Sequence, residues 1–442
     1  MLRNKIVNVC AFVFVFLAAA AGVTAQDSAA FLQNEVIIKL NQASDLNSVA
    51  AQFGLDPAPI DQFGTQPIYR LRILNNANVQ QIVTQLRSDA NRVAYADPNY
   101  IIAAPGASTV PWSLGGSWSI GGSWSIGGSV KGFSRQWMRQ KINLPAAHAI
   151  STGRGVKVAV IDTGIDLQHP IFTGKLLPGY DFVDNDNDPS EVGAPYVGAY
   201  GHGTHVAGIL TMVAPDAKIM PLRVLDQNGV GNTWRLAKAL SFAANPDGND
   251  ATNDGVDIIN LSLGTTQRTS LVRNLLQAET DHDSMPHHRL NGPGGGFPGI
   301  NSPGIVVVAA AGNTGDETMI FPAAEQAVEF ERIGGLIAVG ASTSYDTLAD
   351  FSTRGRWVQV MAPGDKIVSS IPGGRYGIWR GTSMSAPVVA GIAALVEAKY
   401  PSIKSEFVLD KIRGTSVQAT GTMMRRVDAE RALTVSQPPP QP

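Results

Sequence analysis

Cysteine is almost absent from this chain of 442 residues, which contains a single one, Cys10. It lies in an apolar N-terminal segment that we expect to be removed. The mature protein is therefore expected to have no disulfide, no thiolate metal site and no cysteine nucleophile. Charge is also scarce, since charged residues make up 16% of the chain and the net charge is −2. Because no strong electrostatic field results, neither nucleic acid nor an anionic membrane surface is an expected partner.

The longest hydrophobic run of the chain lies at the N-terminus. Two basic residues precede an apolar run over residues 6–21, and Val23 and Ala25 occupy the −3 and −1 positions of a cleavage site. This arrangement predicts a secretory signal peptide over residues 1–25, and hence a secreted or periplasmic protein. An uncleaved anchor is the alternative, although the run is shorter than the roughly 20 residues that span a bilayer. Since no later run is long enough, we expect no stable membrane insertion.

Residues 26–106 show the pattern of a small α+β domain. The segments NEVIIKL, IYRLRI and VAYADPNYII are typical of strands, while DLNSVAAQF and NVQQIVTQLRSD carry the apolar spacing of helices. An order of strand, helix, strand, helix, strand at this length predicts a ferredoxin-like plan. By itself, this plan indicates no function.

From residue 134 to residue 436 the pattern changes to long apolar runs separated by glycine-rich turns. VKVAVI, KIMPLRVL, DIINLSL, GIVVVAAA and LIAVG are apolar throughout, as strands buried on both faces must be. Helical segments such as RLAKALSFAA lie between some of them. The pattern predicts an α/β fold in which a parallel sheet carries helices on both faces, with a functional site at the carboxyl ends of its strands. A Pro-rich tail follows at residues 437–442.

Three polar residues lie at strand ends or helix starts of this predicted sheet. Asp162 ends the apolar run of VAVIDTGID, His202 begins a helix in GHGTHVAGI, and Ser383 lies between a glycine and an apolar helix in GTSMSAP. A serine becomes a nucleophile when a base removes its proton, and a carboxylate holds that base in the right tautomer. The chain therefore supplies one candidate for each of these roles.

The segments DTGID, HGTHVAG, AAAGN and GTSMSAP, in this order, resemble the four signature segments of the subtilisin family of serine proteases. The resemblance extends over about residues 134–435. It implies that Asp162 orients the imidazole, that His202 is the general base and that Ser383 attacks the scissile carbonyl. Asn313 in AAAGN matches the family's oxyanion donor, a role that suits an amide because it donates a hydrogen bond without carrying charge.

The same resemblance implies a substrate cleft between two exposed backbone edges, where an extended peptide adds as a strand. Ile320 falls at the floor of the pocket for the substrate residue before the cleaved bond. Its branched apolar side chain predicts an apolar preference there. The residues expected to bind substrate are Gly229, Gly231, Ser262, Leu263, Gly264, Ala311, Gly312 and Ile320.

No cofactor is expected to be required for this chemistry, but Ca2+ is a candidate structural ion. HVAGILTMVAPDAK continues without the insertion that carries a tight calcium site in many relatives, so that site is expected to be absent. DFVDNDNDP resembles a second calcium loop of thermitase-like members, with Asp184, Asp186 and Asp188 as candidate ligands. It lacks the glycine and the glutamate of an EF-hand, and a plain acidic turn is the alternative.

The first domain resembles the inhibitory propeptide of secreted subtilases, which implies that the chain's own propeptide is an intramolecular inhibitor. Residues 107–133 join the two domains and contain the unit Trp-Ser-Leu/Ile-Gly-Gly-Ser three times. Glycine and serine favour a flexible linker. Three alternatives remain for these repeats: tryptophans that stack on a polymer surface, a strand with unusual spacing, or a duplication without a selected role.

Taken with the resemblance, these motifs predict a secreted, self-processing serine endopeptidase that acts on peptides or proteins by an Asp-His-Ser triad. A catalytically silent peptide-binding protein on the same fold is the alternative. The presence of all three triad residues together with Asn313 favours the enzyme.

Overall fold

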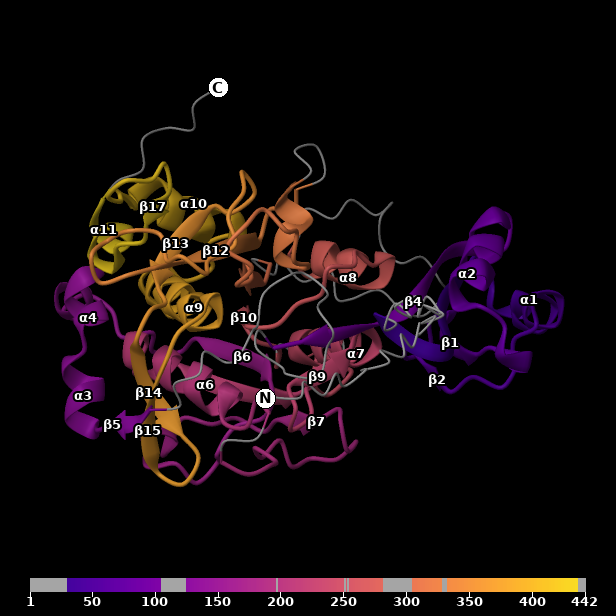
Figure 1. The fold of residues 1–442 in the computed structure, drawn as a ribbon, viewed down its shortest axis with the longest axis horizontal. Helices are drawn as coiled ribbons and strands as arrows, with labels where there is room; N and C mark the ends of the chain where they lie inside the picture. The colour runs from indigo at the N-terminus through magenta and orange to yellow at the C-terminus, as the bar shows by residue number, and fades with distance from the viewer. Residues whose placement is uncertain are drawn as a thin grey trace, which may run out of the picture.

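The computed structural model describes residues 30–104, 125–195, 198–249, 252, 254–280, 304–327 and 332–435. Within these ranges the chain forms a small N-terminal unit and a larger α/β unit, joined along one strand (Figure 1). The expected signal segment, most of the expected linker and the Pro-rich tail lie outside the described residues. No helix in the described part of the chain is long and apolar enough to cross a membrane.

The small unit packs two helices on an antiparallel sheet, as the sequence predicts. Its first strand alternates, with Val36, Ile38 and Leu40 in the core beneath the helices. Ile37, on the opposite face, packs instead against the larger unit, with Trp234 in the same buried cluster. The elements are β1 (Phe31–Leu40), η1 (Ala43–Asp45), α1 (Leu46–Phe53), β2 (Asp61–Gln62), β3 (Ile68–Arg72), η2 (Leu74–Asn76), α2 (Val79–Ser88) and β4 (Val93–Ala103).

The larger unit is built on a nine-stranded, mostly parallel sheet in the order β16-β17-β13-β12-β11-β10-β6-β8-β7. The interior strand β10 pairs in parallel with β6 and with β11. This confirms the predicted α/β class. The strands are β6 (Lys157–Asp162), β7 (Tyr180–Asp181), β8 (Lys218–Arg223), β10 (Ile258–Leu261), β11 (Val306–Ala310), β12 (Leu336–Ser342), β13 (Val360–Pro363), β16 (Val417–Gln418) and β17 (Arg425–Arg426).

Helices cover both faces of this sheet, which explains why its strands are apolar throughout. In β6, Val158 and Val160 face one buried cluster, shared with α6 and α9, while Ala159 and Ile161 face another, shared with α7 and α8. The helices are α3 (Val130–Arg135), α4 (Trp137–Lys141), α5 (Leu144–His148), η3 (Pro170–Phe172), α6 (His202–Val213), α7 (Thr233–Ala244), α8 (Ser270–Thr280), η4 (Ala323–Ala327), α9 (Thr382–Lys399), α10 (Ser405–Thr415) and α11 (Ala429–Thr434).

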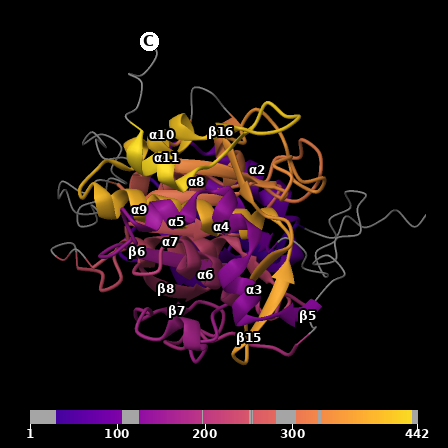
Figure 2. The same ribbon diagram turned by 90° about the vertical axis from the view of Figure 1, so that its left-hand side faces the viewer.

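Part of the third repeat is a strand. β5 (Ser125–Gly128) pairs antiparallel with β15 (Arg375–Trp379), which in turn pairs with β14 (Ile367–Ile371). At Gly128 a Cβ would lie 2.7 Å from the carbonyl carbon of Tyr376, so this close approach requires glycine. The Oγ of Ser129 then accepts from the N–H of Gly132 and caps α3. The end of the expected linker thus lies against the larger unit, where Figure 2 shows β5 beside β15.

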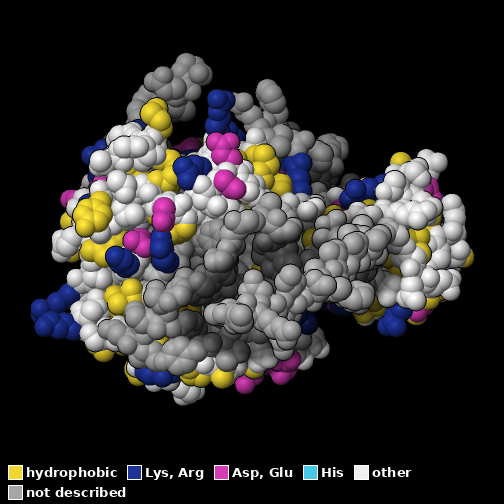
Figure 3. All heavy atoms as spheres, viewed as in Figure 1, with side chains coloured by type: hydrophobic (Ala, Val, Ile, Leu, Met, Phe, Trp, Pro, Cys, Tyr) yellow, Lys and Arg dark blue, Asp and Glu magenta, His cyan; other side chains and the backbone are white. Residues whose placement is uncertain are grey.

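Figure 3 shows the two units as a large and a smaller lobe. On this face, basic and acidic side chains are intermixed among neutral ones, in keeping with the low net charge of −2. The small unit contributes four strands to a five-stranded sheet whose fifth strand, β9 (Val230–Asn232), belongs to the larger unit. This shared sheet brings the C-terminal end of β4 to the site described next.

Candidate active site

The three candidate catalytic residues come from three elements that end or begin at the same edge of the sheet. Asp162 is the last residue of β6, His202 is the first residue of α6, and Ser383 is the second residue of α9. Their exposed fractions are 0%, 2% and 2%. Parallel strands end at one edge of a sheet and the following helices begin there, so residues far apart in the sequence meet at this edge.

Asp162 and His202 form a buried pair. His202 Nδ1 lies 2.7 Å from Asp162 Oδ1 and donates its hydrogen to that carboxylate. The same oxygen accepts from the backbone N–H of Thr163 at 2.7 Å. Burial alone would lower the pKa of His202, but the charge of Asp162, the hydrogen bond to it and the charge of Glu191 raise that pKa above its ordinary value. The arrangement leaves Nε2 of the imidazole as the atom that can take up a proton.

Ser383 is held against Ser262, which follows β10, the strand next to β6 that carries Asp162. Its Oγ donates to the carbonyl oxygen of Ser262 at 3.3 Å, and Ser262 Oγ donates to the carbonyl oxygen of Ser383 at 3.0 Å. His202 Nε2 is buried and has no hydrogen-bond partner among the described residues. The structure thus has no hydrogen bond between Ser383 Oγ and His202 Nε2, a bond that in enzymes often tightens only in the substrate complex.

Asn313 follows β11 and is held by its carbonyl oxygen. Its Oδ1 accepts from the backbone N–H of Thr382 at 2.8 Å and from the Thr382 hydroxyl at 2.9 Å. Its Nδ2 lies close to Gly381, where a Cβ would come within 3.2 Å of it. The amide nitrogen therefore stands next to the residue pair that precedes Ser383, with its hydrogens left to donate to a developing negative charge.

The C-terminal end of β4 lies between two backbone edges of the larger unit. On one side Ile102 is paired with Gly231, and the Ala104 N–H donates to the Gly229 carbonyl at 2.9 Å. On the other side the N–H of Ala103 donates to the Gly264 carbonyl at 2.9 Å, and the Gly264 N–H donates back at 3.0 Å. The predicted edge residues Gly229, Gly231 and Gly264 are therefore the ones that bind this segment, and they bind it as a strand.

Ile320 fills the space between two of the expected pocket residues. A Cβ at Gly312 would lie 2.6 Å from Ile320 Cγ1, and a Cβ at Gly264 would collide with Ile320 Cγ2. The Ile320 side chain is 7% exposed. Two other expected residues, Leu263 and Ala311, are buried in the core cluster on the α7 side of the sheet.

The three candidate calcium ligands are directed to different partners. Asp184 Oδ2 pairs with Arg223 Nη1 at 2.5 Å. Asp186 Oδ1 accepts from the N–H of Asp188, and Asp188 Oδ1 accepts from the N–H and hydroxyl of Ser190. Within the described ranges, no three His, Cys, Asp or Glu side chains come together in a way that could hold a metal ion. The three carboxylates thus do not converge on one point, and the choice between a calcium loop and an acidic turn stays a prediction.

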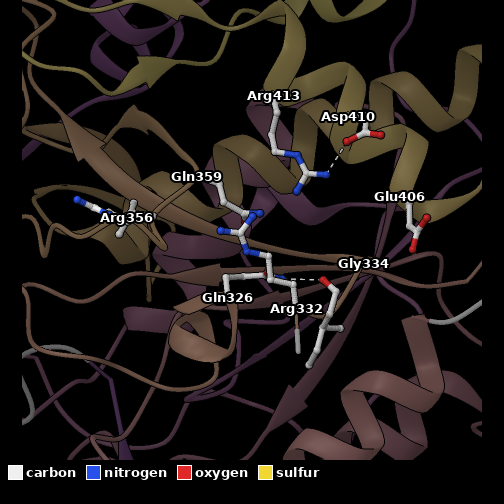
Figure 4. Close-up of a pocket in the computed structure, with 10 residues that line it drawn as sticks. Gln326, Arg332, Gly334, Arg356, Gln359, Glu406, Asp410 and Arg413 are labelled. Atoms are coloured by element: carbon white, nitrogen blue, oxygen red, sulfur yellow. Dashed lines mark hydrogen bonds and ion pairs between the residues drawn. The ribbon is translucent and has the colours of Figure 1, made fainter. Parts of the chain in front are cut away.

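A separate pocket of about 470 Å³ lies away from these residues (Figure 4). In it Arg413 pairs with Asp410 at 2.6 Å, and Gln326 Nε2 donates to the carbonyl oxygen of Ile333 at 2.7 Å. None of the candidate catalytic residues lines this pocket. The lining residues are Gln326, Arg332, Ile333, Gly334, Arg356, Val358, Gln359, Glu406, Asp410 and Arg413.

The hydrogen bonds that hold the small unit on the larger one could not be predicted from the sequence. Asp97 Oδ2 accepts from the backbone N–H groups of Ser270 at 2.7 Å and Leu271 at 3.4 Å, at the start of α8. Asn99 Oδ1 accepts from the N–H of Trp234 at 3.2 Å, at the start of α7. These side chains cap two helices of another unit. A cap supplied from so far away in the chain leaves no local sequence signal.

Two family models match the chain. The model described as the subtilase family matches residues 153–432, and the fervidolysin N-terminal prodomain matches residues 18–99. The chain is 33% identical over 429 residues to the thermophilic serine proteinase of Bacillus sp. (strain AK1), covering 92% of this chain and 89% of that protein. It is 35% identical over 315 residues to thermitase of Thermoactinomyces vulgaris, covering 68% of this chain and 96% of thermitase.

A solved structure shares the fold of both units. The structure of fervidolysin from Fervidobacterium pennivorans, described as a keratinolytic enzyme related to subtilisin, superposes with a TM-score of 0.69. The superposition covers 92% of this chain and 62% of that one, at 22% sequence identity.

Proposed function

The chain belongs to the subtilase family of serine endopeptidases, and we propose that it hydrolyses peptide bonds with a triad of Asp162, His202 and Ser383. The observation that carries this proposal is the 2.7 Å hydrogen bond between Asp162 and His202, buried at the sheet edge where α9 presents Ser383. A neutral imidazole held by a carboxylate at Nδ1 can accept a proton only at Nε2. A serine nucleophile needs such a proton acceptor, and His202 Nε2 can supply it.

The proposed reaction follows from these positions. His202 Nε2 takes the hydroxyl proton as Ser383 Oγ bonds to the scissile carbonyl carbon, and Asp162 stabilises the imidazolium that forms. The carbonyl oxygen becomes an oxyanion, to which Asn313 Nδ2 donates. The imidazolium then gives its proton to the leaving amine, and an acyl-enzyme remains. A water molecule, deprotonated by the same histidine, releases the acyl group. No cofactor takes part in these steps.

The position of β4 supports an inhibitory role for the N-terminal unit. Residues 101–104 occupy both backbone edges that an extended substrate would use. Since Ala103 pairs antiparallel with Gly264, β4 runs in the direction of Ser262, whose carbonyl accepts from Ser383. We propose that the chain is a zymogen, that it cleaves itself downstream of Ala104, and that the cut end stays bound as an inhibitor.

Ile320 supports a preference for small apolar side chains before the cleaved bond. Its side chain fills the space between Gly264 and Gly312, which in an open pocket would receive the substrate side chain.

Secretion is the further part of the proposal and rests on the N-terminal segment of residues 1–25. The enzyme's substrates would then be extracellular or periplasmic peptides and proteins.

Replacing the nucleophile tests this proposal. The variant Ser383→Ala should lose hydrolysis of casein, because loss of this residue costs about a millionfold in turnover in subtilisin. It should also migrate as one unprocessed band on a denaturing gel, while the wild type gives two bands and is blocked by a serine-directed inhibitor. Normal maturation of the variant, in the absence of other proteases, would exclude self-processing. A wild type that binds peptides without cleaving them would indicate the catalytically silent alternative.

A further inference from the structure

Glu191 lies in the segment between β7 and α6 and connects the two elements that carry Asp162 and His202. Its Oε1 accepts from the hydroxyl of Thr163 at 2.6 Å, and Thr163 directly follows Asp162. Its Oε2 accepts from the hydroxyl of Thr204 at 2.8 Å and from the N–H of that residue at 3.2 Å, in the first turn of α6. One carboxylate therefore bridges the end of β6 and the start of α6.

Further hydrogen bonds join the segment after β6 to the first turn of α6. The Thr163 hydroxyl accepts from the backbone N–H of Gly203 at 2.9 Å, and the Thr204 hydroxyl accepts from the N–H of Asp166 at 2.9 Å. The backbone of Glu191 itself is tied to the segment after β6, where its N–H donates to the carbonyl oxygen of Ile165 at 3.1 Å. A shift of α6 against β6 would break several of these bonds together.

Glu191 also contributes charge. Burial raises the pKa of Glu191 to about 7, against the hydrogen bonds from Thr163, Gly201 and Thr204, and the charge of Asp162 adds to the rise. Above about pH 7 the group is therefore ionised. In that state it acts with Asp162 to raise the pKa of His202.

Other titratable groups also lie around Glu191 and His202. Tyr200, before α6, has a raised pKa because of its partial burial and the charges of Glu191 and Asp166, while Arg375 on β15 lowers it. Burial lowers the pKa of His205 to about 3, and the charge of His202 adds to this, so His205 remains neutral. Asp162 and Glu191 are thus the two carboxylates whose charges favour protonation of His202.

We propose that Glu191 is a positioning residue for the proposed reaction: its carboxylate keeps Asp162 aligned on His202, and its negative charge favours the imidazolium that forms during catalysis. It acts through these residues and has no role in bonding to substrate. The inference rests on the proposed function, since it concerns how the histidine of that triad is tuned.

The test is the dependence of kcat/KM on pH, measured on a short peptide with mature enzyme. In Glu191→Gln a nearby negative charge is lost, so the imidazolium is less favoured and the basic form of His202 persists to lower pH. The midpoint of the acid limb of this pH profile should move down by about half a pH unit. In Glu191→Asp the charge remains but the shorter side chain cannot span both threonines. The midpoint should stay in place while kcat falls.

Glu279→Gln is the matched control. Glu279 is a second buried glutamate, whose pKa burial raises to about 8, and it lies near the start of β11, at the sheet edge opposite the triad. This control should leave the acid limb unchanged. A lower melting temperature in Glu191→Gln without movement of the limb would mean a merely structural role and overturn the proposal. If Glu191→Gln does not fold, an unchanged kcat in Glu191→Asp would overturn it as well. Absence of any activity in the wild type would instead refute the proposed function.

Discussion

Asn313 is held through its carbonyl oxygen, and we propose its amide nitrogen as the oxyanion donor. In Asn313→Gly, turnover should fall by roughly a hundred- to a thousandfold while KM changes little, because the donor acts mainly on the oxyanion of the transition state. Steady-state kinetics on a peptide substrate measures this. Asn185→Gly is the control, since Asn185 is exposed and has a φ of 62°, which glycine adopts easily. An unchanged turnover number in Asn313→Gly would mean that the oxyanion donor is misassigned.

A substitution of Ile320 tests directly which substrate side chain is preferred before the cleaved bond. Ile320→Gly should open the space between Gly264 and Gly312 and raise kcat/KM for large aromatic side chains relative to alanine by about tenfold or more. Peptides that differ only at the residue before the cleaved bond measure this ratio. Met319→Ala changes a neighbouring residue that is 48% exposed and should leave the ratio unchanged. A wild type that cleaves best after lysine or arginine would contradict the pocket assignment.

At the scale of elements, the helix-capping contacts of Asp97 and Asn99 contribute to the hold of the N-terminal unit on the larger one. Asp97→Ala removes the acceptor for two N–H groups at the start of α8, and a lost cap costs about 1 kcal/mol. The full-length variant should therefore show a shorter lag before casein hydrolysis begins, since the inhibitory unit leaves sooner. In the control, Asp56→Ala, the lost carboxylate accepts from the N–H of Ala58, within the small unit itself. An equal lag in both variants would show that the cap does not limit release.

At the scale of the whole molecule, β5 bears on where the mature enzyme begins. Because Ser125–Gly128 pairs with β15, and β15 leads directly to the segment before Ser383, this strand is expected to stay with the mature enzyme. The mature N-terminus, read by mass spectrometry, should then precede Ser125. Gly128→Ala should lower the melting temperature of the mature enzyme, because a Cβ there would lie 2.7 Å from the backbone of Tyr376. Gly414→Ala, where nothing lies within 4 Å, is the control. A mature chain that begins after Gly128 would mean that β5 is discarded with the repeats.

What the sequence determined by itself was the sheet and the identity of the candidate triad. The apolar runs around Val158 and Val307 became buried parallel strands because burial on both faces requires an unbroken apolar segment, and such a segment is visible without a structure. The motifs around Asp162, His202 and Ser383 were visible for a similar reason, since each is contained within a few consecutive residues.

Only the tertiary structure decided how separate segments cooperate. Glu191 bridges two elements, Asp97 caps a helix of another unit, and β5 finds its partner strand far along the chain. Each of these contacts is a hydrogen bond between groups remote in sequence, so it imposes no spacing or periodicity on either segment. A glycine-rich repeat such as Ser125–Gly128 is also compatible with both a coil and a strand. Its state depends on whether an unpaired strand edge lies within reach, which is a property of the folded molecule.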